Sequence, residues 1–420
     1  MAARGLLTAP IQSATDSPRS SLWDVGADAC PSLHQESQRE PAPARHRVLL
    51  YNVDEGGAGS RAPLPGYPGD PRLGRPTTWW PLVTEDTQSS WADADSAMHA
   101  KTVLDWIRTR RADVVAVCEA LGWTNRRQRV LGVSDPAALK RRASRAGFPF
   151  AELLQAGGGF HIALLSVRPI RVLHYEGSES SSHFERGLLA AETGGVIYIV
   201  VHLHAHSVRA RGGEAVRVAQ LARDLEAEHQ LPVAVLGDMN TLSPLDHDCL
   251  EALDIASFMT SPSVPSRLRE KYLVQVRAST RRMAKATLSG TSGHSVTGGA
   301  RNGSTPWIVD YSPMASLLAP KDKGGWKLND VVAGSHPSQL KPHEDASPWE
   351  TCLGTVPTRV SIIEGVPPED IPPYRLDYVL GSPRLLRAHH DMVCSVVREP
   401  HTLVMSDHFP IECDWASRQQ

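Results

Sequence analysis

The sequence predicts an α/β protein in which strands and helices alternate along one folded region. Short apolar runs such as Val48–Tyr51 and Val114–Cys118 are typical of buried strands. Between them, the apolar residues of His99–Arg111 recur every three or four positions, which is the pattern of an amphipathic helix. Because the two kinds of element interleave, each must cover the other in layers.

The same two patterns predict the remaining elements. A helix is expected over 136–146, where Asp135 and Pro136 form a typical cap and first-turn pair. Another is expected over 214–229, whose apolar residues share one face. Further strand-like runs lie at 161–166, 170–175, 196–203, 232–236, 376–380, 392–397 and 409–414.

The chain divides into a leader and one domain. Residues 1–45 are rich in Ser, Pro and Ala without a sustained period, which predicts a disordered leader, although the first fifteen residues are also compatible with organelle targeting. The folded domain is expected over 46–416, with an irregular insertion at about 255–372. Within the insertion, the Gly/Ser/Thr-rich stretch 286–305 is typical of a mobile loop.

Composition limits the kinds of molecule that the protein can contact and the compartments that suit it. The net charge of -2 excludes a polycation, so contact with nucleic acid would require a local basic patch. Basic residues gather at 126–129, 140–142 and 267–285, where solvated helix faces are the default interpretation and contact with an anionic substrate is the alternative. No apolar run is long enough to cross a bilayer, and no pattern indicates an oligomer. The six cysteines form no CxxC pair, which predicts reduced thiols in an intracellular protein of the cytoplasm or nucleus.

Polar side chains follow several predicted strands at the point where each strand ends. Such positions are where a sheet can gather a site from distant parts of the chain. One of these residues alone could be a turn former or a helix cap, but that reading is strained for six segments together. The residues are Asn52, Asp54, Glu119, His202, Asp238, Asn240, Asp377, Asp407 and His408.

These residue types suit the cleavage of a phosphoester. Carboxylates and an Asn amide bind a hard cation such as Mg²⁺ through oxygen. A desolvated Asp can orient or deprotonate a water molecule. A His held by a second Asp keeps one tautomer and can be cationic near phosphate.

Six sequence blocks resemble the motifs of the endonuclease/exonuclease/phosphatase superfamily, in the same order. The resemblance covers about 47 to 415, apart from much of 255–372. It implies a four-layer αββα sandwich, with two mostly antiparallel sheets packed face to face and helices outside. The blocks are LLYNVD, DVVAVCEALGW, VVHLHAHS, VLGDMNTLSPLD, RLDYVLGS and MSDHFPIECDW.

The resemblance also implies roles for the polar residues. The predicted metal ligands for Mg²⁺, or Mn²⁺ in its place, are Asn52, Asp54, Glu119 and Asp407. The predicted catalytic residues are His202, Asp238, Asn240, Asp377 and His408. Among these, Asp238 would position the attacking water, Asn240 and His202 would contact the phosphate, and Asp377 would hold His408.

Alternatives remain open at this point. The substrate implied first is nucleic acid, and the second is a lipid or inositol phosphate; a non-catalytic binding module that retains the fold is the rival class. His202, His204 and His206 alternate along one strand face, which would also suit a zinc hydrolase. A pairing of Asp377 with its neighbour Arg375 alone is the alternative to its pairing with His408.

Overall fold

Two six-stranded sheets organise the chain in the computed structural model. The first sheet has the strand order β13-β14-β1-β2-β4-β3, and the second has the order β11-β12-β8-β7-β6-β5. The structure describes residues 45–53, 103–120, 136–156, 160–177, 184–262, 264, 273–278, 307–318, 326–335, 353–356, 372–399 and 402–416. Asp54, residues 1–44 of the expected leader and the loop 286–305 lie outside these residues.

The first sheet is assembled from both ends of the domain. Its strands are β1 (Arg45–Asn52), β2 (Val114–Cys118), β3 (Phe150–Leu154), β4 (Ile162–Ser166), β13 (Val393–Val396) and β14 (Ile411–Ala416). All neighbouring strands are antiparallel except β1 and β2, which run parallel.

The second sheet repeats this arrangement. Its strands are β5 (Arg171–Glu176), β6 (Leu188–Thr193), β7 (Val196–His202), β8 (Val233–Asp238), β11 (Asn329–Asp330) and β12 (Asp377–Gly381). Here β7 and β8 form the one parallel pair among the described strands of the sheet. Each sheet therefore has one place where the carboxyl ends of two neighbouring strands meet.

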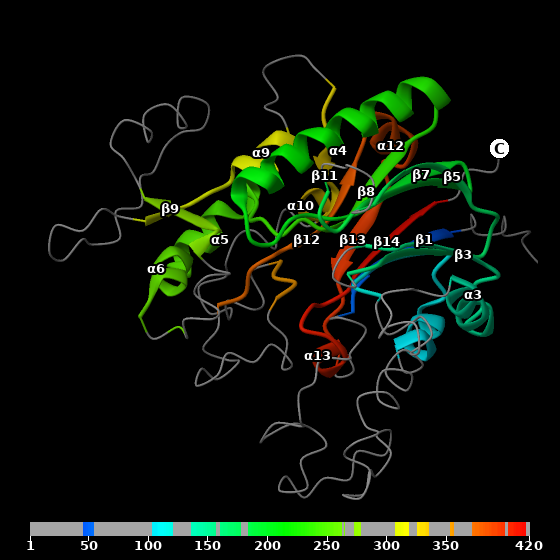
Figure 1. Cartoon of the computed structure of the whole chain (residues 1–420), viewed down its shortest axis with the longest axis horizontal. Helices are drawn as coiled ribbons and strands as arrows, with labels where there is room; N and C mark the ends of the chain where they lie inside the picture. Colours follow the sequence, from blue (N-terminus) through cyan, green and yellow to red (C-terminus); the bar gives the residue numbers. More distant parts are fainter. Residues whose placement is uncertain are drawn as a thin grey trace, which may run out of the picture. The chain divides into compact units, whose positions relative to one another are not determined.

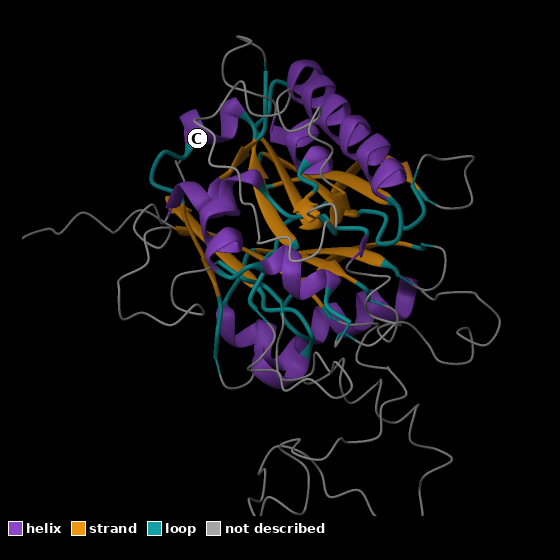
Figure 2. Ribbon diagram, turned by 90° about the vertical axis from the view of Figure 1, so that its left-hand side faces the viewer, coloured by secondary structure: helices purple, strands orange, loops and turns teal. Residues whose placement is uncertain are grey.

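Four layers result from the way the apolar side chains alternate. Inward-facing residues of both sheets form one shared cluster, with Val48 and Leu50 of β1 packed with Val200 of β7 and Leu236 of β8. Residues of opposite parity face outward and are covered by helices, which Figure 2 shows on both sides of the strands. The expected αββα sandwich is confirmed.

The outer helices are amphipathic, as their sequences predict. Residues 103–110 and α3 (Pro136–Arg145) cover the first sheet, whereas α4 (Val208–His229) and α9 (Ser312–Leu318) cover the second. Figure 1 shows α4 lying along β7 and β8. The remaining elements are η6 (Pro244–Asp246), α5 (His247–Ala252), α6 (Ile255–Thr260), β9 (Val276–Ala278), β10 (Trp307–Val309), α10 (Val331–Ser335), α12 (Pro383–Ala388) and α13 (Thr402–Met405).

Parts of the insertion are integrated into the domain. Val276 and Met259 pack in a cluster with Leu376, the residue before Asp377. Gln275 donates a side-chain hydrogen bond of 2.7 Å to the carbonyl of Asn240. The described insertion therefore borders the predicted site directly, which its irregular sequence did not indicate.

Two features of the local structure differ from expectation. Strands β3 and β6 were not predicted, because Phe150–Leu154 and Leu188–Thr193 show no alternation of apolar and polar residues and are rich in the helix formers Ala, Glu and Leu. Helix α4 begins at Val208, earlier than expected, since the Ser207 hydroxyl accepts from the Ala210 N–H and caps it ahead of two glycines. Among the described residues, no helix combines the length and apolar character that crossing a membrane requires.

The prediction of reduced cysteines is wrong for three of the four cysteines that the structure describes. Cys394 and Cys413 face each other across β13 and β14 and form a disulfide, and Cys249 is also disulfide-bonded. Sequence separation gave no sign of the cross-strand pair, because only the strand register brings its two Cα atoms to 4.0 Å. Cys118 is a free and buried thiol, as expected.

Candidate active site

Strand register places three of the predicted residues side by side. His202 at the end of β7 pairs with Asp238 at the end of β8, and Asp238 pairs with Asp377 at the start of β12. Each lies two positions from a residue whose side chain faces the other sheet, and therefore points to the same side of its strand. These neighbouring residues are Val200, Leu236 and Val379, respectively. The three side chains therefore occupy one end of the space between the sheets.

Close approach of β7 and β8 explains the glycine before Asp238. A Cβ at Gly237 would lie 1.8 Å from the carbonyl oxygen of Val201, which no side chain can tolerate. Gly237 thus allows the parallel pairing that sets Asp238 beside His202.

The first sheet contributes Asn52 and Glu119 to the same end. Asn52 pairs with Cys118 across the parallel strands β1 and β2, and Glu119 follows at once. Glu119 has a φ of 62°, a left-handed conformation that is costly for a non-glycine residue and is found disproportionately at functional sites. Asn240 also has a positive φ, of 47°.

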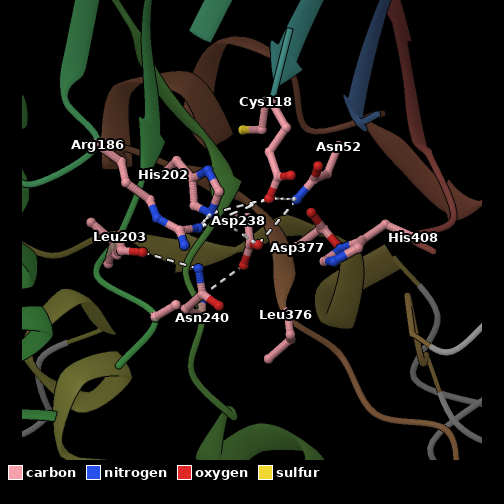
Figure 3. A network of polar contacts seen from close by, with 12 residues as sticks. Asn52, Cys118, Arg186, His202, Leu203, Asp238, Asn240, Leu376, Asp377 and His408 are labelled. Carbon is pink, nitrogen blue, oxygen red and sulfur yellow. Dashed lines mark hydrogen bonds and ion pairs between the residues drawn. The ribbon is translucent and has the colours of Figure 1, made fainter. Parts of the chain in front are cut away.

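Asn52 links the two sheets. Its amide nitrogen donates to Oδ2 of Asp238 at 3.1 Å and to Oε1 of Glu119 at 3.4 Å. The other oxygen of Asp238 accepts from the backbone N–H of Asn240 at 2.8 Å, and the Asn240 amide donates to the carbonyl of Leu203 at 2.9 Å. Figure 3 shows Asp238 at the centre of this network.

The electrostatic environment keeps Asp238 ionised. Burial opposes ionisation, but the hydrogen bond and charge of His202 and the charge of His408 outweigh it and hold the pKa of Asp238 below its ordinary value. Asp238 is therefore an acceptor, which is what the orientation of a water molecule requires.

Asp377 and His408 form the expected pair. Oδ2 of Asp377 lies 2.6 Å from Nδ1 of His408, and both side chains are buried. Burial alone would lower the pKa of His408, but the carboxylates of Asp377, Asp407 and Asp238 raise it to about 10. The ring is therefore cationic at neutral pH.

The alternative pairing of Asp377 with Arg375 is not formed. Arg375 instead makes bidentate contacts with Asp246 and Asp330 in a separate buried network. Asp377 receives its backbone support from the insertion, because the hydroxyl of Thr355 accepts the N–H of Asp377 at 3.2 Å.

Asp407 is the most exposed of the described residues predicted at the site, with a side chain 22% accessible. Its Oδ1 lies 3.8 Å from Nε2 of His408. The side chain can thus reach an ion or a substrate that approaches from solvent.

Arg186 is a site residue that the sequence analysis missed. It lies in the segment before β6, is 6% exposed and stacks on the ring of Phe160, with 3.9 Å from its guanidinium carbon to the ring centre. Its Nη1 contacts Nε2 of His202 and lies 3.9 Å from Glu119. An arginine two residues before the apolar run of β6 was the available signal, since a core strand has no use for such a charge.

Arg186 and His202 leave hydrogen-bonding capacity at the site. Nε of Arg186 and Nδ1 of His202 are both buried, and neither has a hydrogen-bond partner among the described residues. Figure 3 shows the two side chains converging from the side opposite His408. Buried polar atoms of this kind can bind a further group, and an anionic group suits a site that contains a buried arginine.

The donor set fits a divalent cation. Ligand atoms of Glu119, His202 and Asp238 lie within 4.8 Å of one another, as do those of Asp238, Asp377 and His408. Four carboxylates, those of Glu119, Asp238, Asp377 and Asp407, gather against the two cations Arg186 and His408. The excess of negative charge and the oxygen-rich ligands suit a hard cation such as Mg²⁺.

The alternating histidines do not converge on one ion. His202 lies in the site, whereas Nδ1 of His204 accepts the N–H groups of His206 and Ser207. Nε2 of His204 faces Glu185 at 3.1 Å. This arrangement gives the zinc alternative no support among the described residues.

The chain belongs to the Endonuclease/Exonuclease/phosphatase family, whose model matches residues 92–408. The class is therefore that of the phosphoester hydrolases, as the sequence motifs implied. Asn52 precedes the matched region, and its place in the site rests on the parallel register of β1 with β2.

Several solved structures are similar to this chain at low sequence identity. An AP endonuclease from Archaeoglobus fulgidus is 13% identical with a TM-score of 0.46, and the match covers 88% of this chain and 98% of that one. A 3'-5' exonuclease from Neisseria meningitidis is 13% identical with a TM-score of 0.44, covering 89% and 100%. A humanized D. rerio TDP2 is 12% identical with a TM-score of 0.38, covering 89% and 99%. No curated protein matches the sequence.

Proposed function

We propose that the protein is a divalent-metal-dependent phosphodiesterase that acts on nucleic acid. The observation that carries the proposal is the convergence of opposite charges around Asp238. The carboxylate of Glu119 lies 3.7 Å from Nε2 of His202 and 3.9 Å from Nη1 of Arg186, and the buried side chains of Arg186 and His202 add hydrogen-bonding groups. A divalent cation held by the carboxylates and the cationic groups beside them would together neutralise the charge of a phosphodiester.

The metal ligands of the proposal are Asn52, Glu119 and Asp407, with Asp54 as a further candidate outside the described residues. Mg²⁺ is the proposed ion and Mn²⁺ can replace it, because both prefer oxygen donors. When bound, the cation polarises a phosphoryl oxygen and neutralises negative charge.

Each protein residue has a defined task in this scheme. Asp238 accepts a hydrogen bond from the attacking water, while its own orientation is fixed by Asn52 and Asn240. Arg186 and His202 bind non-bridging oxygens of the phosphate. The His408 cation, held by Asp377, stabilises the charge that develops on the phosphoryl group.

Nucleic acid is proposed as the substrate because the description of the family names endonucleases and exonucleases before phosphatases. The test is a panel of purified substrates with Mg²⁺ and Mn²⁺: abasic duplex, single-stranded DNA, polyadenylated RNA, sphingomyelin and inositol phosphates. Asp238→Asn is the matched inactive control, because it keeps the shape of the side chain. Turnover of a nucleic acid that this variant lacks supports the proposal. Turnover of only lipid or inositol phosphates refutes the substrate, and binding without turnover refutes the enzyme.

We also infer that the protein matures in an oxidising compartment, since disulfides persist in such compartments and are rare in the cytosol. The cytoplasm or nucleus was predicted from reduced thiols, and the disulfides remove that basis. Peptide mapping of the native protein under non-reducing conditions tests the inference. Recovery of Cys394 and Cys413 as free thiols would refute it.

A further inference from the structure

Helix α4 buries two charged side chains near its start that an outer helix does not require. Arg211 and Glu214 lie one turn apart near its start, and each is only 1% exposed. The apolar residues that attach α4 to the second sheet begin with Ala215 and Val218. Burial of a carboxylate is unfavourable unless hydrogen bonds replace its hydration, so Glu214 must have specific partners.

The two oxygens of Glu214 bind two separate segments. Oε1 accepts the backbone N–H of Glu185 at 3.2 Å, and Oε2 accepts the backbone N–H of His204 at 2.6 Å. Glu185 directly precedes Arg186, and His204 lies two residues after His202. One carboxylate therefore fixes both segments that carry the phosphate-facing residues of the site.

Arg211 holds the other side of the same loop. Its Nη1 donates to the carbonyl oxygens of His204 at 2.9 Å and Ala205 at 3.2 Å. Its Nη2 donates to the carbonyl of Val274 at 2.9 Å, next to Gln275, which in turn holds Asn240. The loop after His202 is thus bound on its N–H side by Glu214 and on its carbonyl side by Arg211.

We propose that Glu214 is a positioning residue that sets Arg186 against His202 by holding the backbone of residues 185 and 204. The proposal rests on the proposed function, which gives Arg186 and His202 their phosphate. Glu214 touches no substrate; its effect passes through the two peptide N–H groups. Displacement of a substrate-binding group by about 1 Å can reduce a rate about a hundredfold. Loss of the two hydrogen bonds that Glu214 accepts should therefore reduce turnover strongly.

The test compares two buried glutamates of the same helix. Glu214→Gln keeps the volume of the side chain but turns an amide NH₂ group toward one of the two N–H donors. Glu226→Gln is the matched control: Glu226 is also buried and accepts hydrogen bonds from Ser382, the Arg384 N–H and Trp326, all remote from the strand ends that carry the site. Both variants should lose similar thermal stability.

Only Glu214→Gln is expected to lower kcat, by about tenfold to a hundredfold with a smaller change in KM. Combined with Arg186→Ala, it should cost less than the product of the two single losses, because both act on one contact. Equal losses of kcat in both glutamate variants, or full additivity with Arg186→Ala, would overturn the proposal.

A second measurement does not depend on turnover. Hydrogen exchange at the amides of Glu185 and His204 should accelerate in Glu214→Gln and stay slow in Glu226→Gln. If the wild-type protein turned over no phosphoester while these amides behaved as expected, the proposed function would be refuted and the positioning role of Glu214 would still be supported. Unchanged exchange at both amides would refute the positioning role of Glu214, whatever the activity of the enzyme.

Discussion

Replacement of Asp377 by Asn isolates the electrostatic role of the Asp377–His408 pair. The substitution keeps the size of the side chain and a possible contact with Nδ1, but it removes the negative charge 2.6 Å from the ring. His408 is 3% exposed, so solvent cannot replace that charge. The lowering of the His408 pKa by burial would then be opposed only by the charges of Asp407 and Asp238, so this pKa should fall.

The size of the change follows from the wild-type value. A pKa of about 10 against an ordinary 6.5 corresponds to roughly 5 kcal/mol in favour of the imidazolium. Asp377 is the largest of the causes that raise this pKa, so its loss should remove on the order of half of that preference, or about two pH units. The wild-type ring stays cationic up to about pH 10. The variant ring should lose its proton at a pH about two units lower.

The assay is the pH dependence of kcat/KM. Because the proposed mechanism uses the cationic ring, activity should be retained at low pH and lost as pH rises through the pKa of His408. Asp377→Asn should therefore move the alkaline limb of the profile downward by about two pH units. Asp246→Asn is the control, because this buried aspartate belongs to the Arg375 network and its loss should change stability without moving the limb.

A double-mutant cycle completes the test. The variant Asp377→Asn with His408→Ala should lose little more activity than His408→Ala alone, since residues that act as a unit are not additive. An alkaline limb that stays in place, together with multiplicative losses, would refute the pair and leave His408 without an orienting group.

Three further predictions follow from the site and its scaffold. Glu119→Gln should lower activity at least about a hundredfold at low Mg²⁺, with partial rescue at high Mn²⁺, in a metal titration of the initial rate; an unchanged rate would contradict its role as a ligand. Gly237→Ala should destabilise the fold by at least about 3 kcal/mol in urea unfolding, because its Cβ meets the Val201 carbonyl at 1.8 Å. Burial lowers the pKa values of His46 and His161 to about 4 each. The unfolded chain therefore binds protons that the folded protein does not, and the free energy of unfolding should fall as pH decreases from 6.5 to about 4. A flat pH profile of urea unfolding in that window would contradict this expectation.

Sequence patterns predicted the strands that carry the site better than the rest of the fold. The apolar runs ending at Asn52, His202 and Asp238 are continuous and end in a residue that cannot serve a core, so both the strand and its functional end could be recognised. Strands β3 and β6 carry no such signal, and they were missed although they lie in the same sheets.

Contacts between distant segments could not be predicted in this way. Arg186 becomes part of the site only because its segment lies beside the end of β7, and nothing near it in sequence specifies that contact. The disulfide of Cys394 with Cys413 depends on strand register, and the support of Asp377 by Thr355 depends on the path of the insertion. Register and insertion paths are set by packing across the whole domain, which local periodicity does not encode.

The position of the site follows from the one parallel strand pair that each sheet contains among the described strands. Antiparallel neighbours place a strand end beside a strand start, whereas a parallel pair brings two carboxyl ends together. The pair β1–β2 presents Asn52 and Glu119, and the pair β7–β8 presents His202 and Asp238. The hydrogen bond from Asn52 to Asp238 joins the two pairs across the core, so the proposed metal ligands Asn52 and Glu119 and the proposed phosphate-binding His202 come from opposite sheets. In the proposed mechanism, a phosphoester is therefore held by both sheets, and its geometry depends on the packing that fixes one sheet against the other.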